Sequence, residues 1–291
     1  MILDISPRVD YAFKHTFGRE STRPLLIDVT NSVLTPSPGH LIDDLFLLNP
    51  FNPKESLDDK LSILDIKAKD QSGRQLNLEM QMLATPYYEK RILYYAARLH
   101  QLQLHEGEDY VNLKPTISIS FLDHMLFPKM PGYHWRFRLL EETSHFPLTD
   151  DLEFHIIELP KFTKSISELQ HGLDFWLYFF RNAEKIDTEA IPDELKKYPP
   201  VILALEELKM LAQTDVERER YESRRKAQLD DKTRINVARM EGRTEGLVNM
   251  IHFCERMLRQ PETPVEQLAT LSLTDLTRLA DELQKLLLVQ A

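Results

Sequence analysis

Two acidic side chains interrupt a stretch of sequence that otherwise favours a β-hairpin. Residues 61–82 read LSILDIKAKDQSGRQLNLEMQM, and Asp65 and Glu79 fall one in each of its two alternating runs. Side chains alternate between the two faces of a strand, and the loop QSG suits a three-residue turn with positive φ at Gly73. That turn places Asp65 directly opposite Glu79 on one face, whereas a two-residue loop would put the two on opposite faces.

Two carboxylates that oppose each other on adjacent strands favour a cation between them. Their Cβ atoms lie ~5 Å apart, so the two charges repel unless one is protonated or a cation binds. Hard divalent cations such as Mg²⁺ prefer oxygen ligands and are often held by one or two carboxylates. We therefore predict a small metal site at Asp65 and Glu79. In the alternative, both carboxylates face solvent, paired with Lys67 and Lys69, because antiparallel sheets commonly have one polar, solvated face.

The remaining patterns predict the elements around this hairpin. Thr85 and Pro86 form a good helix start, with an N-cap threonine and a proline at the first helical position. The charged run that follows residue 215 is helical in composition but interrupted by EGRTEG at 241–246. We predict helices at 7–17, 23–34 and 86–105, strands at 41–48, 115–121, 133–140 and 152–159, and helices from 165 almost to the end. A mixed sheet flanked by helices fits this order, with an α/β domain over residues 1–182 and a helical region over 183–291.

Composition excludes several classes of protein. The net charge of −10 argues against a broad, passive coat on nucleic acid, although an enzyme with a local basic groove remains compatible. Cys254 is the only cysteine, which excludes an intrachain disulfide and a multi-cysteine zinc site and fits a cytoplasmic location. No apolar run approaches the ~20 residues that span a bilayer, so we expect no membrane association. The first residues, MILDISPRVDY, lack the features of a signal peptide.

A series of segments in this order resembles a known family. An acidic residue in a first helix, an Asp on one strand, E-x-Q on the next and a following helix resemble the PD-(D/E)XK nuclease superfamily. More closely, residues 4–165 are similar to the Rpn family of recombination-promoting nucleases and putative transposases. The segments that carry the similarity are DYAFKHTFG, DDKLSILDIKAKD, LNLEMQM, YYEKRILYYAARL, LKPTISISFLD, YHWRFRLLE and LTDDLEFHIIELPKF. This resemblance implies a restriction-endonuclease-like mixed sheet with a C-terminal helical extension, and a Mg²⁺-type DNA endonuclease that also accepts Mn²⁺.

The resemblance also implies roles for particular residues. Asp65 and Glu79 would hold the metal, and the backbone carbonyl of Met80 would be a further ligand. Asp10 matches the acidic residue of the first helix and would close the catalytic site. Lys14, one helical turn later, or Arg91 would offset negative charge on the phosphate in the transition state.

The two departures from the superfamily pattern lie at positions 64 and 81. Leu64 stands where the motif has proline, which is a backbone preference rather than a chemical group. Gln81 stands where the motif usually has lysine, so it would orient the attacking water without adding charge. Arg91 and Tyr95 match the helix after the core, where members of the superfamily often contact phosphate.

Three functional hypotheses remain open from the sequence. The first is an endonuclease that acts on double-stranded DNA in recombination or mobile-element biology. The second is an RNA-directed or end-processing nuclease that uses the same residues, because the metal chemistry does not select the sugar. The third is an inactive relative that binds a protein partner. That partner would bind through the C-terminal helices, whose leucine stripe in residues 264–289 also makes them a candidate site of homo-oligomer formation.

Overall fold

A mixed β-sheet forms the centre of the first of two compact units. The computed structural model describes residues 2–35, 40–49, 51, 52, 62, 63 and 65–290. Contacts within the chain define the units Met1–Gln228 and Leu229–Ala291. Leu61 and Leu64 of the predicted hairpin lie outside the described residues.

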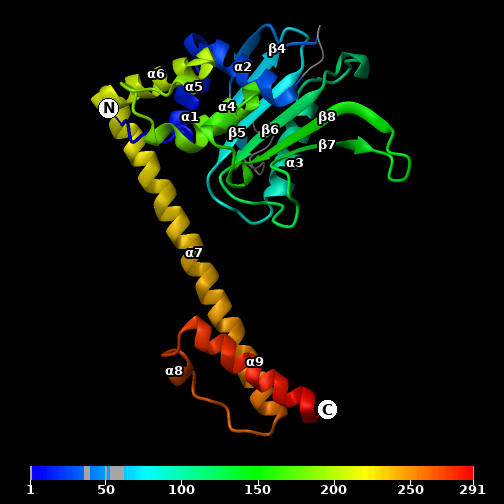
Figure 1. Ribbon diagram of the computed structural model, residues 1–291. Coiled ribbons are helices and arrows are strands. Elements are labelled where there is room, and N and C mark those ends of the chain that lie inside the picture. The colour runs from blue at the N-terminus through cyan, green and yellow to red at the C-terminus, as the bar shows by residue number, and fades with distance from the viewer. Residues whose placement is uncertain (1, 36–39, 50, 53–61, 64, 291) are drawn as a thin grey trace. The chain divides into compact units, whose positions relative to one another are not determined.

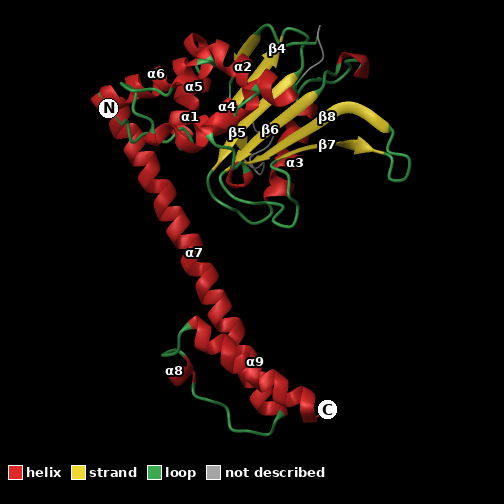
Figure 2. Ribbon diagram, in the orientation of Figure 1, coloured by secondary structure: helices red, strands yellow, loops and turns green. Residues whose placement is uncertain are grey.

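The described strands of the main sheet follow the order β1-β4-β5-β6-β8-β7 (Figure 2). The pairs β1–β4, β4–β5 and β7–β8 are antiparallel, whereas β5–β6 and β6–β8 are parallel. This mixed topology confirms the predicted fold class. The strands are β1 (Leu45–Leu48), β4 (Ile66–Asp70), β5 (Gln75–Gln81), β6 (Thr116–Leu122), β7 (His134–Leu140) and β8 (Pro147–Glu158), while β2 (Phe51–Asn52) and β3 (Ser62–Ile63) form a separate pair.

Helices cover both faces of this sheet (Figure 1). One face packs against a group of helices in which α1 contacts β5 and α2 contacts β1, and the opposite face packs against α3, which contacts β5, β6 and β8. The β5–α3–β6 segment is a crossover that joins parallel strands, as such strands require. The helices of this unit are α1 (Asp10–Phe17), α2 (Arg23–Leu34), α3 (Tyr88–Gln101), α4 (Gly172–Asn182), α5 (Asp193–Lys196), α6 (Pro199–Gln213) and the start of α7 (Asp215–Met257), with single 3₁₀ turns at Glu20–Thr22, Tyr110–Asn112, Leu159–Lys161, Ile166–Glu168 and Ala183–Lys185.

Aromatic side chains fill the core between the sheet and the helices on its first face. The α4 sequence GLDFWLYFFRN buries Trp176, Phe179 and Phe180 completely. Phe17 of α1 packs edge-on against Trp176 at a ring-centroid distance of 5.3 Å, and Phe121 of β6 lies 4.8 Å from Phe180. Such aromatic contacts add to the free energy gained from apolar burial. The core therefore ties α1 and α4 firmly to the centre of the sheet.

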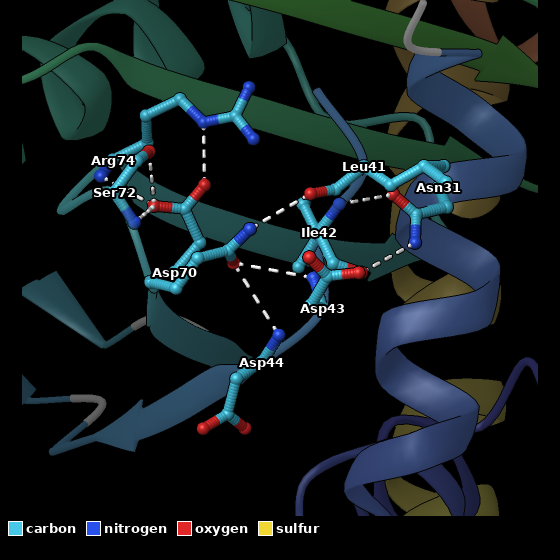
Figure 3. Close-up of polar contacts among 9 residues, drawn as sticks. Asn31, Leu41, Ile42, Asp43, Asp44, Asp70, Ser72 and Arg74 are labelled. Atoms are coloured by element: carbon cyan, nitrogen blue, oxygen red, sulfur yellow. Dashed lines mark hydrogen bonds and ion pairs between the residues drawn. The ribbon is translucent and has the colours of Figure 1, made fainter. Parts of the chain in front are cut away.

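The turn between β4 and β5 is held by a buried carboxylate. Asp70 Oδ1 accepts hydrogen bonds from the backbone N–H groups of Ser72 and Arg74, both at 2.9 Å, and Asp70 Oδ2 accepts one from Arg74 Nε. Figure 3 shows this turn beside the segment before β1, where Gln71 Nε2 donates to the carbonyl of Leu41 at 2.8 Å. Asn31 of α2 binds the same segment through two hydrogen bonds: its Nδ2 donates to the carbonyl of Ile42, and its Oδ1 accepts from the backbone N–H of Ile42. These bonds fix the hairpin relative to β1 and α2.

Two predicted helix features differ from the structure. Helix α3 begins at Tyr88 rather than Pro86, and its N-cap is Tyr87 in a left-handed conformation, not Thr85. Helix α7 runs without interruption for 43 residues through Gly242 and Gly246. Glycine lowers helix propensity by only about 1 kcal/mol, and the surrounding strong helix formers outweigh this cost.

The second unit is a small helical assembly with its own apolar core. Cys254 and Ile251 of α7 pack with apolar side chains from α8 (Val265–Leu268) and α9 (Leu273–Gln290). In the first unit, α5, α6 and Tyr221 of α7 contribute to the main core, so helices beyond residue 182 pack on the sheet domain. The boundary at 182/183 and the oligomer contact at the C-terminal helices stay predictions. None of the described helices is long and apolar enough to span a membrane.

Replacement of Gly73 by alanine should destabilise the hairpin. Gly73 has φ +92°, and a Cβ atom there would lie 3.1 Å from Cγ of Lys114. A side chain in this region of φ costs ~1–2 kcal/mol, and Lys114 must also move. We expect Gly73→Ala to lower the free energy of unfolding in urea by ~1–2 kcal/mol or more. Gly107→Ala is the matched control, because φ is +87° there but no atom lies within 4 Å of the added Cβ. A Gly73→Ala loss smaller than the Gly107→Ala loss would contradict this account.

Candidate active site

The predicted pairing of the hairpin is confirmed. Ile66 pairs with Leu78 and Lys69 with Gln75, and the backbone N–H of Asp70 donates to the carbonyl of Arg74 at 3.1 Å. Asp65 immediately precedes the first of these pairs. It therefore lies at the open end of the hairpin, next to the carboxyl end of β5, which carries Glu79.

Asp65 is fixed by one backbone donor and one cation. Its Oδ2 accepts a hydrogen bond from the backbone N–H of Met80 at 3.0 Å. Its Oδ1 lies 3.0 Å from the ammonium of Lys14, which α1 extends from the first face of the sheet. The side chain of Asp65 is 19% exposed, so this carboxylate is accessible at one side while both oxygens are oriented.

Glu79 is buried under α3, whose Tyr88 lies against its carboxylate. Its side chain accepts a hydrogen bond from Asn77 Nδ2 at 3.2 Å and a longer one from the hydroxyl of Tyr88 at 3.5 Å. Burial raises the pKa of Glu79 to about 7, and the nearby negative charge of Asp65 contributes further to the rise. The alternative in which both carboxylates face solvent and pair with Lys67 and Lys69 is therefore wrong: Glu79 is only 6% exposed, and Asp65 pairs with Lys14.

Further polar groups lie on the same buried face as Glu79. Asn77 is 1% exposed and pairs in register with Ser118 of β6, which is also 1% exposed. Within the described part of the chain, neither Asn77 Oδ1 nor Ser118 Oγ has a hydrogen-bond partner. Buried polar atoms are normally satisfied by protein or by ordered water. The buried face beside Glu79 therefore holds two polar atoms that the described protein groups leave unsatisfied.

Gln81 and Arg91 form one polar unit next to the carboxylates. Arg91 Nη2 donates to Gln81 Oε1 at 2.6 Å, and Gln81 Nε2 donates to the carbonyl of Leu83 at 2.8 Å. The guanidinium of Arg91 also lies over the ring of Tyr88, 4.8 Å from its centroid. Both polar atoms of the Gln81 side chain are thus engaged, and its predicted part in holding water stays a prediction.

The structure places Tyr95 near this unit but gives Asp10 no direct contact with it. Burial raises the pKa of Tyr95, and the charges of Arg91 and Glu79 act on it in opposite directions. Asp10 begins α1, where its Oδ1 accepts a hydrogen bond from the backbone N–H of Tyr11 at 2.8 Å. Among the described contacts none joins Asp10 to Asp65 or Glu79. Its catalytic part stays a prediction.

Two residues of this site were missed from the sequence. Asn77 and Tyr88 contact Glu79 directly, yet neither is among the predicted site residues. The alternation of strand side chains does place Asn77 on the face of Glu79, and this signal was available. Tyr88 offered no comparable signal, because its contact depends on how α3 packs across the sheet.

The donor set fits a divalent cation. In the described residues no group of three or more His, Cys, Asp or Glu side chains could hold a metal, so the predicted protein side-chain ligands are the two carboxylates of Asp65 and Glu79. Mg²⁺ usually keeps several waters and binds through one or two carboxylates. The shared negative charge that raises the pKa of Glu79 is relieved by a cation, and the backbone carbonyl of Met80 and water would complete the ligand set.

The raised pKa of Glu79 predicts an unusual dependence of stability on pH. With a folded pKa of about 7, Glu79 keeps its proton in the native state at pH values where the unfolded chain has lost it. The contribution of Glu79 to the free energy of unfolding therefore falls as the pH rises from ~4.3, by up to ~3 kcal/mol in total. The decrease levels off above a pH of about 7, where Glu79 is ionised in both states. In EDTA we expect Glu79→Gln and wild type to be similarly stable at pH 5, and the variant to be more stable at pH 8.

Urea unfolding at several pH values measures this difference. Added Mg²⁺ or Mn²⁺ should stabilise the wild type at pH 8 and have little effect on Glu79→Gln. A stability difference between the two proteins that stays constant from pH 5 to pH 8 would show that Glu79 ionises normally.

Comparison with known proteins identifies the family. A family model described as PD-(D/E)XK nuclease family transposase matches residues 7–238. No match was found among the curated proteins or among the solved structures. Nucleases of the PD-(D/E)XK type generally use divalent metals, which agrees with the carboxylate pair. The match covers most of the chain, and the mixed sheet with its flanking helices agrees with it. The chain belongs to the PD-(D/E)XK nuclease family transposases.

Proposed function

We propose that this protein is a Mg²⁺-dependent endonuclease that hydrolyses phosphodiester bonds in double-stranded DNA and acts in recombination or mobile-element biology. Mn²⁺ is the expected substitute metal. The observation that carries the proposal is the buried Glu79 at the carboxyl end of β5, near Asp65, with its pKa raised to about 7. Family membership supports a nuclease-type function.

Asp65 and Glu79 would hold the metal, together with the backbone carbonyl of Met80. When bound, a divalent ion supplies a water of lowered pKa and polarises the scissile phosphate. The backbone N–H of Met80 holds Asp65 Oδ2 in place, so this carboxylate needs little rearrangement before it binds the ion. Asn77 orients Glu79 in the same way.

Two cations approach the carboxylates from opposite faces of the sheet. Lys14 of α1 pairs with Asp65, and Arg91 of α3 donates a hydrogen bond to Gln81 at the end of β5. A substrate phosphate brings additional negative charge to this place, and oriented cations stabilise that charge in the transition state. We assign Arg91 the positive charge that the motif lysine normally supplies at position 81. Gln81 then acts by holding the guanidinium in position.

Cleavage of supercoiled plasmid tests the nuclease assignment. With Mg²⁺ or Mn²⁺ we expect nicking by the wild type, none in EDTA, and none by Asp65→Ala, because that variant loses half of the carboxylate pair. Circular dichroism confirms that the variant is folded. Absence of nicking by folded wild type would refute the DNA endonuclease proposal. Cleavage of RNA under the same conditions would then identify the substrate, and failure on both would favour the partner-binding hypothesis.

Removal of the Arg91 charge tests the assignment of the second cation. We expect Arg91→Gln to lower the rate of nicking by ~10²–10³-fold, as the loss of one oriented donor does in other enzymes. Arg91→Lys should retain more activity, because it preserves the charge but not the bidentate geometry. Arg138→Gln is the matched control, since Arg138 pairs with Asp150 on the β7–β8 hairpin. Equal rates for Arg91→Gln and the control would remove Arg91 from the mechanism.

A further inference from the structure

A polar cavity lies at the opposite end of the hairpin from Asp65. It has a volume of about 740 Å³, and its lining includes Lys69, Gly73, Gln75, Asn112 and Lys114. We refer to it as the lysine cavity. Lys69 follows Asp65 by four residues, which is about 13 Å along an extended strand, and β4 side chains at odd positions share one face. The cavity therefore opens on the same face as Glu79, at the other end of the hairpin.

The two lysines converge on the turn of the hairpin. A Cβ atom at Gly73 would lie 3.1 Å from Cγ of Lys114 and 3.6 Å from Cε of Lys69, so glycine leaves room for both stems. Both side chains are exposed, and in the described part of the chain neither ammonium has an ion-pair partner. Two ammonium groups that line one cavity repel each other, and an anion between them relieves the repulsion.

Rigid elements hold both lysines in place. Lys69 is paired on both sides in the sheet, with Phe46 of β1 and Gln75 of β5. Gln103, just beyond α3, accepts a hydrogen bond from the backbone N–H of Lys114 at 3.1 Å and donates to its carbonyl at 2.9 Å. The positions of the two backbones are therefore fixed before any ligand arrives.

The cavity offers cations and amides without a free carboxylate. Asp70 is the acidic residue in its lining, and the side chain of Asp70 is fully buried and bonded to Ser72 and Arg74. Lysine ammonium groups with Asn and Gln amides are the donors that commonly contact the phosphates and sugars of nucleic acid. This local chemistry contrasts with the net charge of −10 for the whole chain.

Helix α3 connects the lysine cavity to the carboxylates. At its N-terminal end Tyr88 contacts Glu79, and at its C-terminal end His100 Nδ1 lies 3.1 Å from Thr116 Oγ1, next to Lys114. Arg91, Tyr95 and Arg98 are spaced i, i+4, i+7 and share one stripe of this helix. Polar and cationic side chains thus extend from the carboxylate pair to the cavity.

We propose that the lysine cavity binds the sugar–phosphate backbone of the nucleic acid, a few nucleotides from the scissile phosphate. Lys69 and Lys114 contact the phosphates, and Gln75 and Asn112 contact phosphate or sugar oxygens. The bound strand then runs along the α3 stripe of Arg98, Tyr95 and Arg91 toward the carboxylate pair. This inference rests on the proposed function for the identity of the ligand but concerns binding and not hydrolysis.

The salt dependence of binding tests this inference without any cleavage. A fluorescein-labelled oligonucleotide, single-stranded or duplex, is titrated with wild-type protein in EDTA at several salt concentrations. Each phosphate contact contributes a slope of about 0.9 to the logarithmic salt dependence for duplex DNA and about 0.7 for a single strand. We expect the double variant Lys69→Ala/Lys114→Ala to reduce the magnitude of the slope by about 1.8 for the duplex and by about 1.4 for the single strand. Lys197→Ala/Lys226→Ala is the charge-matched control on exposed positions elsewhere in the first unit, and it should leave the slope unchanged.

The outcomes separate this inference from the nuclease proposal. If the cavity variant has a reduced salt slope and the wild type binds but does not cleave nucleic acid, the lysine cavity is supported as a binding site and the nuclease proposal is refuted. Cleavage with an unchanged slope would refute the cavity alone, and wild type that binds neither oligonucleotide would refute both. Inorganic phosphate at matched ionic strength provides a last comparison. If it displaces the oligonucleotide from wild type and from the cavity variant equally, the lysines bind no backbone phosphate.

Discussion

The site depends on the burial of the Glu79 carboxylate near a second carboxylate, Asp65, because burial and then the negative charge of Asp65 raise the pKa of Glu79. Asp70 fixes the turn, the turn sets the pairing of β4 with β5, and this pairing places Asp65, directly before β4, next to the end of β5 that carries Glu79. Helix α3 then excludes water from Glu79, so the repulsion acts where it is poorly screened. A sheet optimised for stability alone would carry apolar or β-branched side chains at these positions. The structure tolerates this local instability, as functional sites commonly do, because the surrounding core is extensive.

The rest of the first unit positions cations around that pair. Lys14 depends on α1, whose Phe13 and Phe17 are completely buried in the aromatic core. The first turns of α7 also hold this region: Tyr11 of α1 donates a hydrogen bond to Glu217, and the backbone N–H of Ser6 donates to the hydroxyl of Tyr221 at 2.8 Å. The residues that follow the sheet domain in sequence therefore fix the helix that carries Lys14. This explains physically why the core of the first unit includes helices beyond residue 182.

Local sequence patterns predicted most helices and strands of the first unit. The burial and pairing of the candidate site residues depend on long-range packing, which these patterns do not specify. The limits of α2, the aromatic helix α4 and the hairpin register follow from side-chain periodicity and from one glycine turn. The burial of Asn77 and Glu79 cannot be predicted from the periodicity of β5. Polar residues alternate with apolar ones in the same way whether solvent or a helix covers the polar face. Only the crossing of α3 over β5 and β6 distinguishes the two. The pair Lys14–Asp65 joins residues 51 positions apart, and no local pattern specifies it.

The exchange of lysine for glutamine at position 81 has a physical explanation in the Arg91 contact. A lysine at this position would place a second cation against the guanidinium and would have no oxygen to accept its N–H group. Glutamine accepts that hydrogen bond through Oε1 and uses Nε2 to bind the carbonyl of Leu83, so the strand end and the helix are joined at two points. The positive charge then comes from a residue that also stacks on Tyr88, which itself contacts Glu79. The departure from the motif is therefore coupled to α3: glutamine on the strand and arginine on the helix together place one positive charge beside the carboxylate pair.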